Sequence, residues 1–388
     1  MDFIAGVTIL LLACIGNAEL WVVLINRRHS LRYRHHHLRR IRTFHDFGIL
    51  LFPPFIFYTA GLGENGLLAG GAVSELPRSL QWILLLTFVG LIPFAYSAVR
   101  WNLRRDPKRL MRVTSEIFDF AALAESNEQR AAVLGEQRLL SRLPFNQLYQ
   151  LEVNVKKLRL QPDAESVRTL RIAHFSDTHL LPCPGPGFHQ QVVEQLCELK
   201  PDFFVFTGDL LDKDELLSDA SELFRRMQTV APGYFILGNH DWHLDVDRIR
   251  SEIVSTGWID VAGTHITVEH QGVSILIAGT EAPWMGRNPV VPEPDSESFR
   301  LLLSHAPDQR NYAESSRYDL MLCGHNHGGQ VVLPVVGPVY SPSCYGVRYA
   351  GGVFEYRNML MHVSRGTGAK DPLRWNCRPE VTLLEVDI

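Results

Sequence analysis

Histidines, aspartates and one asparagine gather at the ends of short apolar runs in the second half of the chain. The clearest case is the segment YDLMLCGHNHGG, in which His325 and His327 follow a run that ends at Cys323. Four other runs end in the same way, with Asp177-Thr178-His179, with Asp209 and Asp212, with Asn239-His240-Asp241, and with His305. Ligands bind beyond the carboxyl ends of strands in α/β sheets. We therefore expect these side chains to converge on one site.

The residue types predict a metal centre built from oxygen and nitrogen ligands. Two aspartates, one asparagine and four histidines form the set: Asp177, His179, Asp209, Asn239, His305, His325 and His327. Such a set suits Mn, Fe or Zn. Seven ligands exceed one tetrahedral site, so we expect two divalent ions that share one carboxylate. Two close cations lower the pKa of a bound water and stabilise a leaving group's charge, which is the chemistry of phosphoester hydrolysis.

The elements that must position these residues are short strands separated by helices. Strands are predicted over 151–160, 170–176, 203–208, 233–239, 273–279, 299–304, 318–323, 330–333, 353–357, 359–364 and 381–387, with helical patterns over 188–199 and 214–228. Strands that alternate with helices predict a parallel sheet. The expected fold class is α/β, with two packed mixed sheets flanked by helices.

Three apolar stretches precede this region, at 3–25, 47–62 and 80–99. The first and third are long enough to cross a bilayer, whereas 47–62 is marginal and a buried or re-entrant segment is its alternative. Basic residues cluster in 27–42 and 100–112, but the loop 63–79 holds only Arg78. Since basic loops stay cytoplasmic, we expect an external N-terminus, about three transmembrane helices and a cytoplasmic C-terminal domain.

Composition narrows the function classes. The formal net charge of -4 and the pI near 6.5 argue against a general nucleic-acid binder. The 6 cysteines form no CxxC pair, which is compatible with a reducing compartment. His174 lies in an apolar run and is expected to be a core histidine, whereas His189, His243, His265 and His270 are expected at the surface.

The order D-x-H, G-D-x-x-D, G-N-H-D, a single H and G-H-x-H resembles the calcineurin-like metallophosphoesterase superfamily, over about 170–388. GHNHGGQVVLPVVGP, and SRGTG followed by RWNCRPEVTLLEV, resemble its membrane-anchored bacterial branch. That branch includes proteins similar to the UDP-2,3-diacylglucosamine hydrolases of lipid A synthesis. The expected organisation is a membrane region over 1–112, a helical connector over 113–149 and a metallophosphoesterase domain over 150–388.

The resemblance also implies residue roles. One metal would be held by Asp177, His179, Asp209 and His327, and the second by Asp209, Asn239, His305 and His325, with Asp209 bridging. His240 matches the family's catalytic histidine beside the leaving-group oxygen, and Asp212 its orienting carboxylate. Arg348 and Arg365 are candidates for substrate phosphate, with Arg365 favoured by the resemblance and a structural role as the alternative. Asn326 and Ala306 depart from the family's frequent threonine and asparagine, which leaves substrate fit less secure than the metal site.

The expected function is hydrolysis of a phosphate ester or pyrophosphate in a lipid-linked substrate at the inner membrane, with Mn as the favoured metal. UDP-2,3-diacylglucosamine, split into UMP and a lipid monophosphate, is the substrate that resemblance and topology suggest, and membrane lipids are the expected partners. Other phospholipid, nucleotide or cell-wall phosphoesters are the alternative substrates. A non-catalytic membrane scaffold is a second class of function, and a transporter or sensor that uses Asn17 and Glu19 is a third.

Overall fold

The computed structural model describes residues 2–33, 35–63, 65–160, 168–293 and 298–388. The chain divides into two compact units. One comprises residues Met1–Arg104 with Pro334–Arg348, and the other comprises Arg105–Leu333 with Tyr349–Ile388. We call them the helical unit and the catalytic unit.

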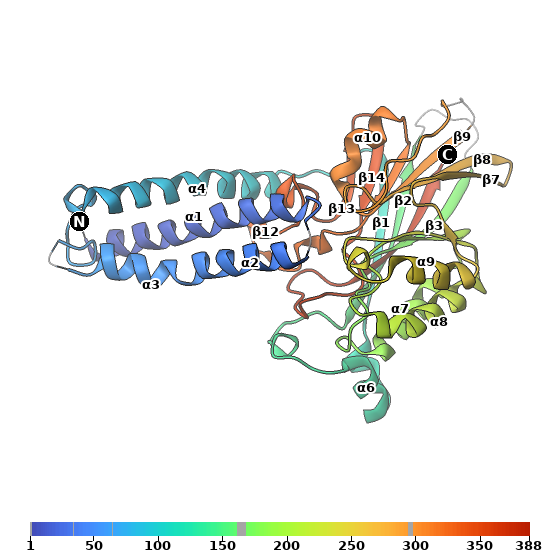
Figure 1. Cartoon of the computed structure of the whole chain (residues 1–388), viewed down its shortest axis with the longest axis horizontal. Coiled ribbons are helices and arrows are strands. Elements are labelled where there is room, and N and C mark those ends of the chain that lie inside the picture. The colour runs from blue at the N-terminus through green and yellow to red at the C-terminus, as the bar shows by residue number, and fades with distance from the viewer. Residues whose placement is uncertain (1, 34, 64, 161–167, 294–297) are drawn as a thin grey trace. The chain divides into compact units, whose positions relative to one another are not determined.

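The helical unit is built from long helices that run side by side (Figure 1). Its elements are α1 (Phe3–His29), α2 (His35–Leu50), α3 (Phe52–Ile56), a π-turn (Phe57–Gly61), a 3-10 turn (Val73–Glu75), α4 (Arg78–Asn102), β12 (Gly337–Pro338) and a 3-10 turn (Gly346–Tyr349). Helices α1 and α4 approach closely through glycines: a Cβ on Gly16 would lie 1.8 Å from the carbonyl oxygen of Thr87. Small residues allow such close backbone contact between apolar helices.

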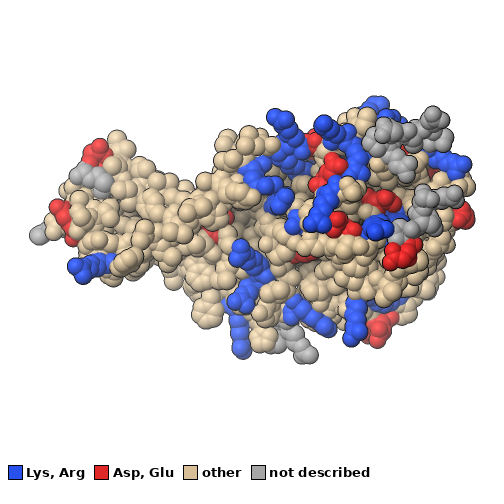
Figure 2. All heavy atoms as spheres, turned by 90° about the horizontal axis from the view of Figure 1, so that it is seen from above, with Lys and Arg blue, Asp and Glu red and all other residues tan. Residues whose placement is uncertain are grey.

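Two helices of the described chain, α1 and α4, are long and apolar enough to cross a membrane. Figure 2 shows an almost continuous tan surface along the helices, with few charged side chains. The predicted stretch 47–62 is not one helix. It is divided among the end of α2, α3 and the π-turn, because Pro53 and Pro54 occupy the first turn of a new helix.

Two sheets form the catalytic unit. The seven-stranded sheet has the order β1-β2-β15-β3-β4-β5-β6, and the six-stranded sheet has the order β13-β14-β10-β9-β8-β7. The bounds are β1 (Leu110–Asp119), β2 (Gln150–Arg159), β3 (Thr169–Phe175), β4 (Phe203–Thr207), β5 (Gly233–Ile236), β6 (Ile259–Asp260), β7 (His265–His270), β8 (Val273–Thr280), β9 (Ser298–Ser304), β10 (Leu320–Cys323), β13 (Gly352–Tyr356), β14 (Met359–Val363) and β15 (Glu380–Asp387). β11 (Val332–Leu333) also belongs to this unit. β3, β4, β5 and β6 are parallel, as are β8, β9, β10 and β14, whereas β15 pairs antiparallel with β3.

Apolar side chains hold these layers together. Between the sheets, Ile172 and Val205 of the first pack with Ile277, Leu301 and Leu320 of the second. Helices α7 (Pro186–Glu198), α8 (Leu217–Gln228) and α9 (Val246–Ser255) lie together in Figure 1, and they pack on the other face of the first sheet in a second core. The remaining helices are α5 (Phe120–Leu123), α6 (Asn127–Leu134) and α10 (Arg310–Ser315). The predicted α/β class with two mixed sheets is confirmed.

The connector expected to be helical over 113–149 is helical only in part. Residues Leu110–Asp119 form β1, which pairs antiparallel with β2, and only α5 and α6 follow as short helices. Most of β1 is exposed, so it lacks the buried alternation that marks a strand, and its pairing with β2 decides its conformation. His189, expected at the surface, is also a correction, because it is 3% exposed on the inner face of α7.

Candidate metal centre

Five neighbouring strands deliver the candidate residues to one edge of the catalytic unit. β3, β4 and β5 lie side by side in one sheet, and β9 and β10 lie side by side in the other. Asp177 and His179 follow β3, Asp209 and Asp212 follow β4, and Asn239 and His240 follow β5. His305 follows β9, while His325 and His327 follow β10. Because these strands are parallel within each sheet, their carboxyl ends face the same side.

The backbone at this edge adopts a conformation that side chains rarely tolerate. Asp177, His179, Asp209, His325 and His327 have φ values of 51°, 39°, 57°, 71° and 49°. A left-handed conformation costs a non-glycine residue on the order of 1–3 kcal/mol, and it persists where the surrounding structure requires it. The backbone N–H of His325 donates to both carboxylate oxygens of Asp177, each at 3.0 Å, so the turns after β3 and β10 fix each other.

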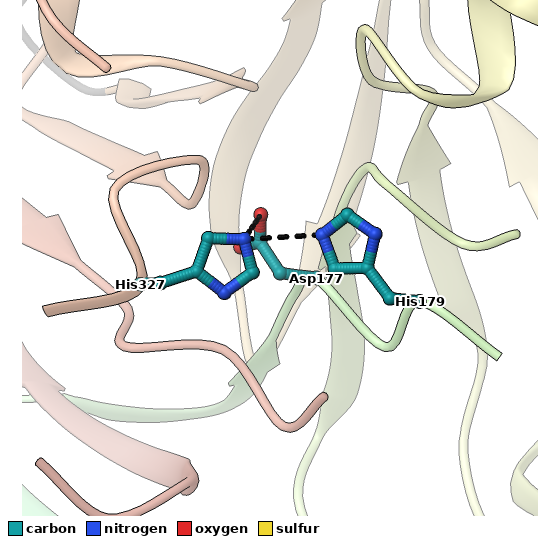
Figure 3. A group of neighbouring side chains, drawn as sticks. All are labelled: Asp177, His179 and His327. Carbon is teal, nitrogen blue, oxygen red and sulfur yellow. Dashed lines mark hydrogen bonds and ion pairs between the residues drawn. The ribbon is translucent and has the colours of Figure 1, made fainter. Parts of the chain in front are cut away.

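The first group of ligand-type side chains comprises Asp177, His179 and His327 (Figure 3). One ligand atom from each lies within 4.8 Å of the others. The Nε2 atoms of His179 and His327 are 3.1 Å apart, and Nε2 of His327 lies 3.5 Å from Oδ1 of Asp177. Asp177 and His179 are fully buried. Two imidazole nitrogens and a carboxylate oxygen therefore face a common point.

The second group comprises Asp209, His305 and His325, again with ligand atoms within 4.8 Å of one another. His305 Nδ1 donates to the carbonyl oxygen of Thr207 at 2.7 Å, which turns Nε2 toward the other members. That Nε2 lies 3.3 Å from Oδ2 of Asp209, 3.1 Å from Nδ1 of His325 and 3.0 Å from Oδ1 of Asn239.

Asp209 links the two groups. Its Oδ2 atom lies 3.6 Å from Nε2 of His179 and 3.3 Å from Nε2 of His305. Its Oδ1 atom accepts from the backbone N–H of His240 at 2.8 Å, which holds the carboxylate in place. The carboxylate therefore stands between imidazoles that belong to different groups.

Asp212 joins the site to its most exposed histidine. Its Oδ2 atom lies 2.8 Å from Nδ1 of His179, and its Oδ1 atom lies 2.6 Å from Nδ1 of His240. His240 retains 20% exposure of its side chain, so part of its ring is accessible from solvent. An imidazole held by a carboxylate at one nitrogen can donate a proton from the other.

The electrostatics of the site favour cations. Burial alone would lower the pKa of His179, but the carboxylates of Asp212, Asp209 and Asp177 outweigh it and raise that pKa to about 9. Burial likewise opposes protonation of His305, yet Asp209 and Asp177 raise its pKa to about 9. Buried carboxylates that draw protons onto neighbouring imidazoles also attract metal ions. The donor set contains carboxylate oxygen, amide oxygen and imidazole nitrogen, so the two His/Asp groups, which Asp209 links, fit a dinuclear metal centre.

Sequence reasoning missed two residues that contact the site. The ring of Trp284 packs against His305 and His325, with centroids 5.3 and 4.8 Å apart. Arg374 is fully buried and donates to the backbone oxygen of His327 at 3.0 Å, with Nη2 3.3 Å from His327 Nδ1. Neither residue follows a site strand, so the strand-end pattern gave no signal for them.

Arg365 has contacts that support the structural alternative. Its Nη2 atom lies 3.1 Å from a carboxylate oxygen of Glu152 and 2.9 Å from one of Glu380. The guanidinium thus neutralises two carboxylates of the first sheet. His174 is fully buried with partners at both ring nitrogens, which confirms its prediction as a core histidine.

The chain is similar in sequence to several known proteins. The chain is 33% identical over 194 residues to phosphodiesterase YaeI of Escherichia coli (strain K12), which covers 49% of this chain and 72% of the relative. It is 30% identical over 228 residues to the uncharacterized metallophosphoesterase YkuE of Bacillus subtilis (strain 168), covering 55% and 77%. It is 29% identical over 270 residues to a transmembrane protein with metallophosphoesterase domain of Danio rerio, covering 65% and 60%.

A family-level match agrees with these relatives. Residues 170–329 match the family described as Calcineurin-like phosphoesterase, and that range contains every residue of the two His/Asp groups. The chain belongs to the calcineurin-like phosphoesterase family of metal-dependent hydrolases.

Proposed function

We propose that the chain is a membrane-anchored phosphodiesterase that uses two divalent metal ions, with Mn favoured, to hydrolyse a lipid-linked substrate. The observation that carries the proposal is the convergence of two His/Asp groups around Asp209, with ligand atoms within 4.8 Å in each group. In this proposal Asp177, His179, Asp209 and His327 hold one ion. Asp209, Asn239, His305 and His325 hold the other.

The bound ions would supply a nucleophilic water and would stabilise charge on the phosphoryl oxygens. The chain's own contribution to bond cleavage is His240, whose Nδ1 is 2.6 Å from Asp212. With Asp212 fixing the ring, the opposite nitrogen of His240 donates a proton to the departing oxygen. Asp212 also contacts His179, so one carboxylate orients both a proton donor and a candidate ligand.

Anchoring supports the lipid part of the proposal. Helices α1 and α4 have the length and apolarity of membrane spans, and one relative is named a transmembrane protein. We propose three crossings, at 3–25, 47–62 and 80–99, of which 47–62 is the marginal one. The basic stretches 27–42 and 100–112 favour a cytoplasmic catalytic unit and an external N-terminus. We retain the division into a membrane region over 1–112, a connector over 113–149 and a catalytic domain over 150–388 as part of this proposal.

UDP-2,3-diacylglucosamine is the specific substrate that we propose to test first among lipid-linked compounds. It is a pyrophosphate on an acylated sugar, and a cytoplasmic active site beside the membrane suits it. Glycerophospholipids and nucleotide diesters are the competing substrates, and the relative YaeI is named simply a phosphodiesterase.

The test is a panel of these compounds, assayed with the full-length protein, with and without Mn²⁺, for the wild type and Asp209→Ala. The proposal predicts Mn²⁺-dependent hydrolysis of at least one lipid-linked compound and its loss in Asp209→Ala, since both proposed sets of metal ligands share that carboxylate. Release of UMP would establish UDP-2,3-diacylglucosamine as a substrate. Hydrolysis that persists undiminished in Asp209→Ala would contradict the two-metal mechanism. A scaffold, by contrast, would hydrolyse nothing and keep its partner binding in Asp209→Ala.

A further inference from the structure

Glu19 is a carboxylate within the apolar helix α1. Within the part of the chain that the structure describes, no hydrogen bond or ion pair involves its side chain. The other polar residue of the same stretch behaves differently, because Asn17 Nδ2 donates to the carbonyl oxygen of Gly48 at 2.9 Å. Polar groups inside a membrane are costly unless they are paired, and an intramembrane carboxylate often marks a binding site.

A cavity of about 210 Å³ lies beside Glu19 within the helical unit. Helices α1 and α4 form two of its walls, and residues of the segment 334–348 form the third. Its polar lining includes Glu19, Arg27, Tyr96 and Ser97, while Phe94 and Val339 contribute apolar surface. Val22, Val23, Val336 and Val347 add further apolar surface, so the cavity combines a few polar groups with apolar walls.

Several contacts hold the segment 334–348 against the two long helices. The backbone N–H of Ser341 donates to Asn26 Oδ1 at 3.3 Å, and the ring of Tyr340 lies edge-on to His29 at 6.3 Å. A Cβ on Gly337, whose φ is 85°, would lie 2.5 Å from Cγ of Trp101. These contacts join the segment to the last turns of both long helices.

The cavity has a direction with respect to the bilayer. Helix α1 ends in Arg27, Arg28 and His29, and α4 has Arg100 in its last turn, so this end belongs at the level of lipid headgroups. Glu19 precedes Arg27 by two helical turns, which corresponds to about 12 Å along the axis. The guanidinium therefore lies toward the headgroup phosphates, and the carboxylate lies deeper, where acyl chains join the lipid backbone.

We infer that this cavity binds a lipid phosphate that carries a free hydroxyl or amide N–H at its acyl linkage. Arg27 binds the phosphate, Glu19 accepts the hydrogen bond from the deeper donor, and the valine-rich walls contact the start of the acyl chain. A lipid with only ester linkages has no donor for Glu19. The order of the two groups also disfavours an amine, because the ammonium of a headgroup lies on the water side of its phosphate.

The probes are lysophosphatidic acid, which has a free hydroxyl beside its acyl ester, and its 2-O-methyl ether, which lacks only that donor. Binding of each is measured on the full-length protein in nanodiscs, with divalent metals chelated to prevent turnover. A charge-assisted hydrogen bond predicts that the wild type prefers the hydroxyl compound by about tenfold or more. Equal affinity of the wild type for both compounds would overturn the inference without any variant.

Three variants assign the contacts. Glu19→Leu is expected to remove the preference, because it removes the acceptor, whereas Arg27→Gln is expected to weaken both compounds alike. Asn17→Ala is the matched control, since Asn17 lies on the same helix and does not line the cavity. It should bind both compounds as the wild type does. A folded Glu19→Leu protein that keeps the full preference would contradict the role of Glu19. The inference rests on the membrane anchoring in the proposed function but not on its catalysis, because binding is measured with the metals chelated. A failure of either can therefore be told from a failure of the other.

Discussion

The catalytic unit contains two clusters of buried histidines that differ in how their hydrogen bonds are ordered. Between the sheets, Lys156 Nζ lies 2.9 Å from His362 Nε2, the two Nδ1 atoms of His362 and His174 are 2.8 Å apart, and His174 Nε2 lies 3.0 Å from Thr207 Oγ1. One direction of donation satisfies the whole chain: Lys156 donates to His362, His362 to His174, and His174 to the hydroxyl of Thr207.

The candidate metal centre has no such order. Its ring nitrogens approach one another and several carboxylate oxygens at once, as for His305 Nε2 with Asp209, His325 and Asn239. Its backbone is held left-handed, whereas none of Lys156, His174, Thr207 and His362 has a positive φ. Burial of histidine is thus common to both clusters. Two features distinguish the candidate metal centre: its carboxylate oxygens and imidazole nitrogens converge on a shared point, and its backbone is strained.

The largest expected effect would come from Asp177→Asn in the candidate centre. The amide nearly matches the carboxylate in shape but lacks its charge, so metal binding should fail and turnover should fall by about 10⁴-fold. The free energy of unfolding should change little, because burial already disfavours the charged form of Asp177 and raises its pKa. Turnover with Mn²⁺ and denaturant unfolding measure the two quantities. If the variant instead lost enough folding stability to explain its lower turnover, the metal centre would not differ from the cluster between the sheets in this respect.

Glu380→Gln, beside the cluster between the sheets, should lower the stability of the fold and leave turnover almost unchanged. Glu380 lies 3.6 Å from Lys156 Nζ, 2.9 Å from Arg365 Nη2 and 2.9 Å from Asn154 Nδ2, all largely buried. Removing its charge leaves the buried ammonium of Lys156 without its carboxylate partner and leaves Arg365 with Glu152 alone, and breaking a buried pair in this way typically costs about 3–5 kcal/mol of stability. Turnover per folded molecule should stay close to the wild-type value. A fall in turnover with stability intact would instead favour a substrate role for Arg365.

Asp212→Asn tests the connection between the metal centre and its exposed edge. Asp212 contacts both His179 and His240, and these imidazoles lower the pKa of Asp212 well below its ordinary value, against the effect of burial. Loss of an orienting carboxylate predicts a fall in kcat of about 10- to 100-fold. The double variant with His240→Gln should lose little more than His240→Gln alone, if Asp212 acts through His240. If the losses in kcat of the two single variants add in the double variant, Asp212 acts through its contact with His179 instead.

The site was easier to predict from sequence than the surface that surrounds it. Buried parallel strands are recognisable as apolar runs, and their ends place polar residues at one edge by geometry alone, so Asp177, Asp209 and His305 could be expected near one another. The left-handed turns could not be predicted, because Asp177 and His325 hold that conformation through contacts between distant segments. Arg374 was missed for the same reason, since its contact with His327 depends on how the last loop returns to the site.

Two errors have different physical origins. The strand β1 was assigned as helix because Ile117, Phe118 and Ala121 have helical spacing, while its pairing with β2 is a tertiary effect. His189 was assigned to the surface by its residue type alone. Its spacing from Val193 and Leu196, both on the buried face of α7, already indicated an inward position.

His189 provides the smallest and most specific test of the comparison, because it is a buried histidine that belongs to neither cluster. Its Nε2 atom has no hydrogen-bond partner within the described chain, and burial lowers its pKa from 6.5 to about 4 against a weaker opposing effect of the Pro184 carbonyl. Since the unfolded chain binds this proton near pH 6.5 and the folded chain only near pH 4, stability is lost as pH falls through that interval. Between pH 7 and 5.5 the loss amounts to about 1 kcal/mol.

His189→Gln tests this loss, because glutamine keeps a donor for Pro184 but cannot titrate. The stability of the variant relative to the wild type should therefore be about 1 kcal/mol higher at pH 5.5 than at pH 7. Denaturant unfolding of both proteins at the two pH values measures this difference, and parallel pH profiles would contradict a lowered pKa of His189 in the folded state.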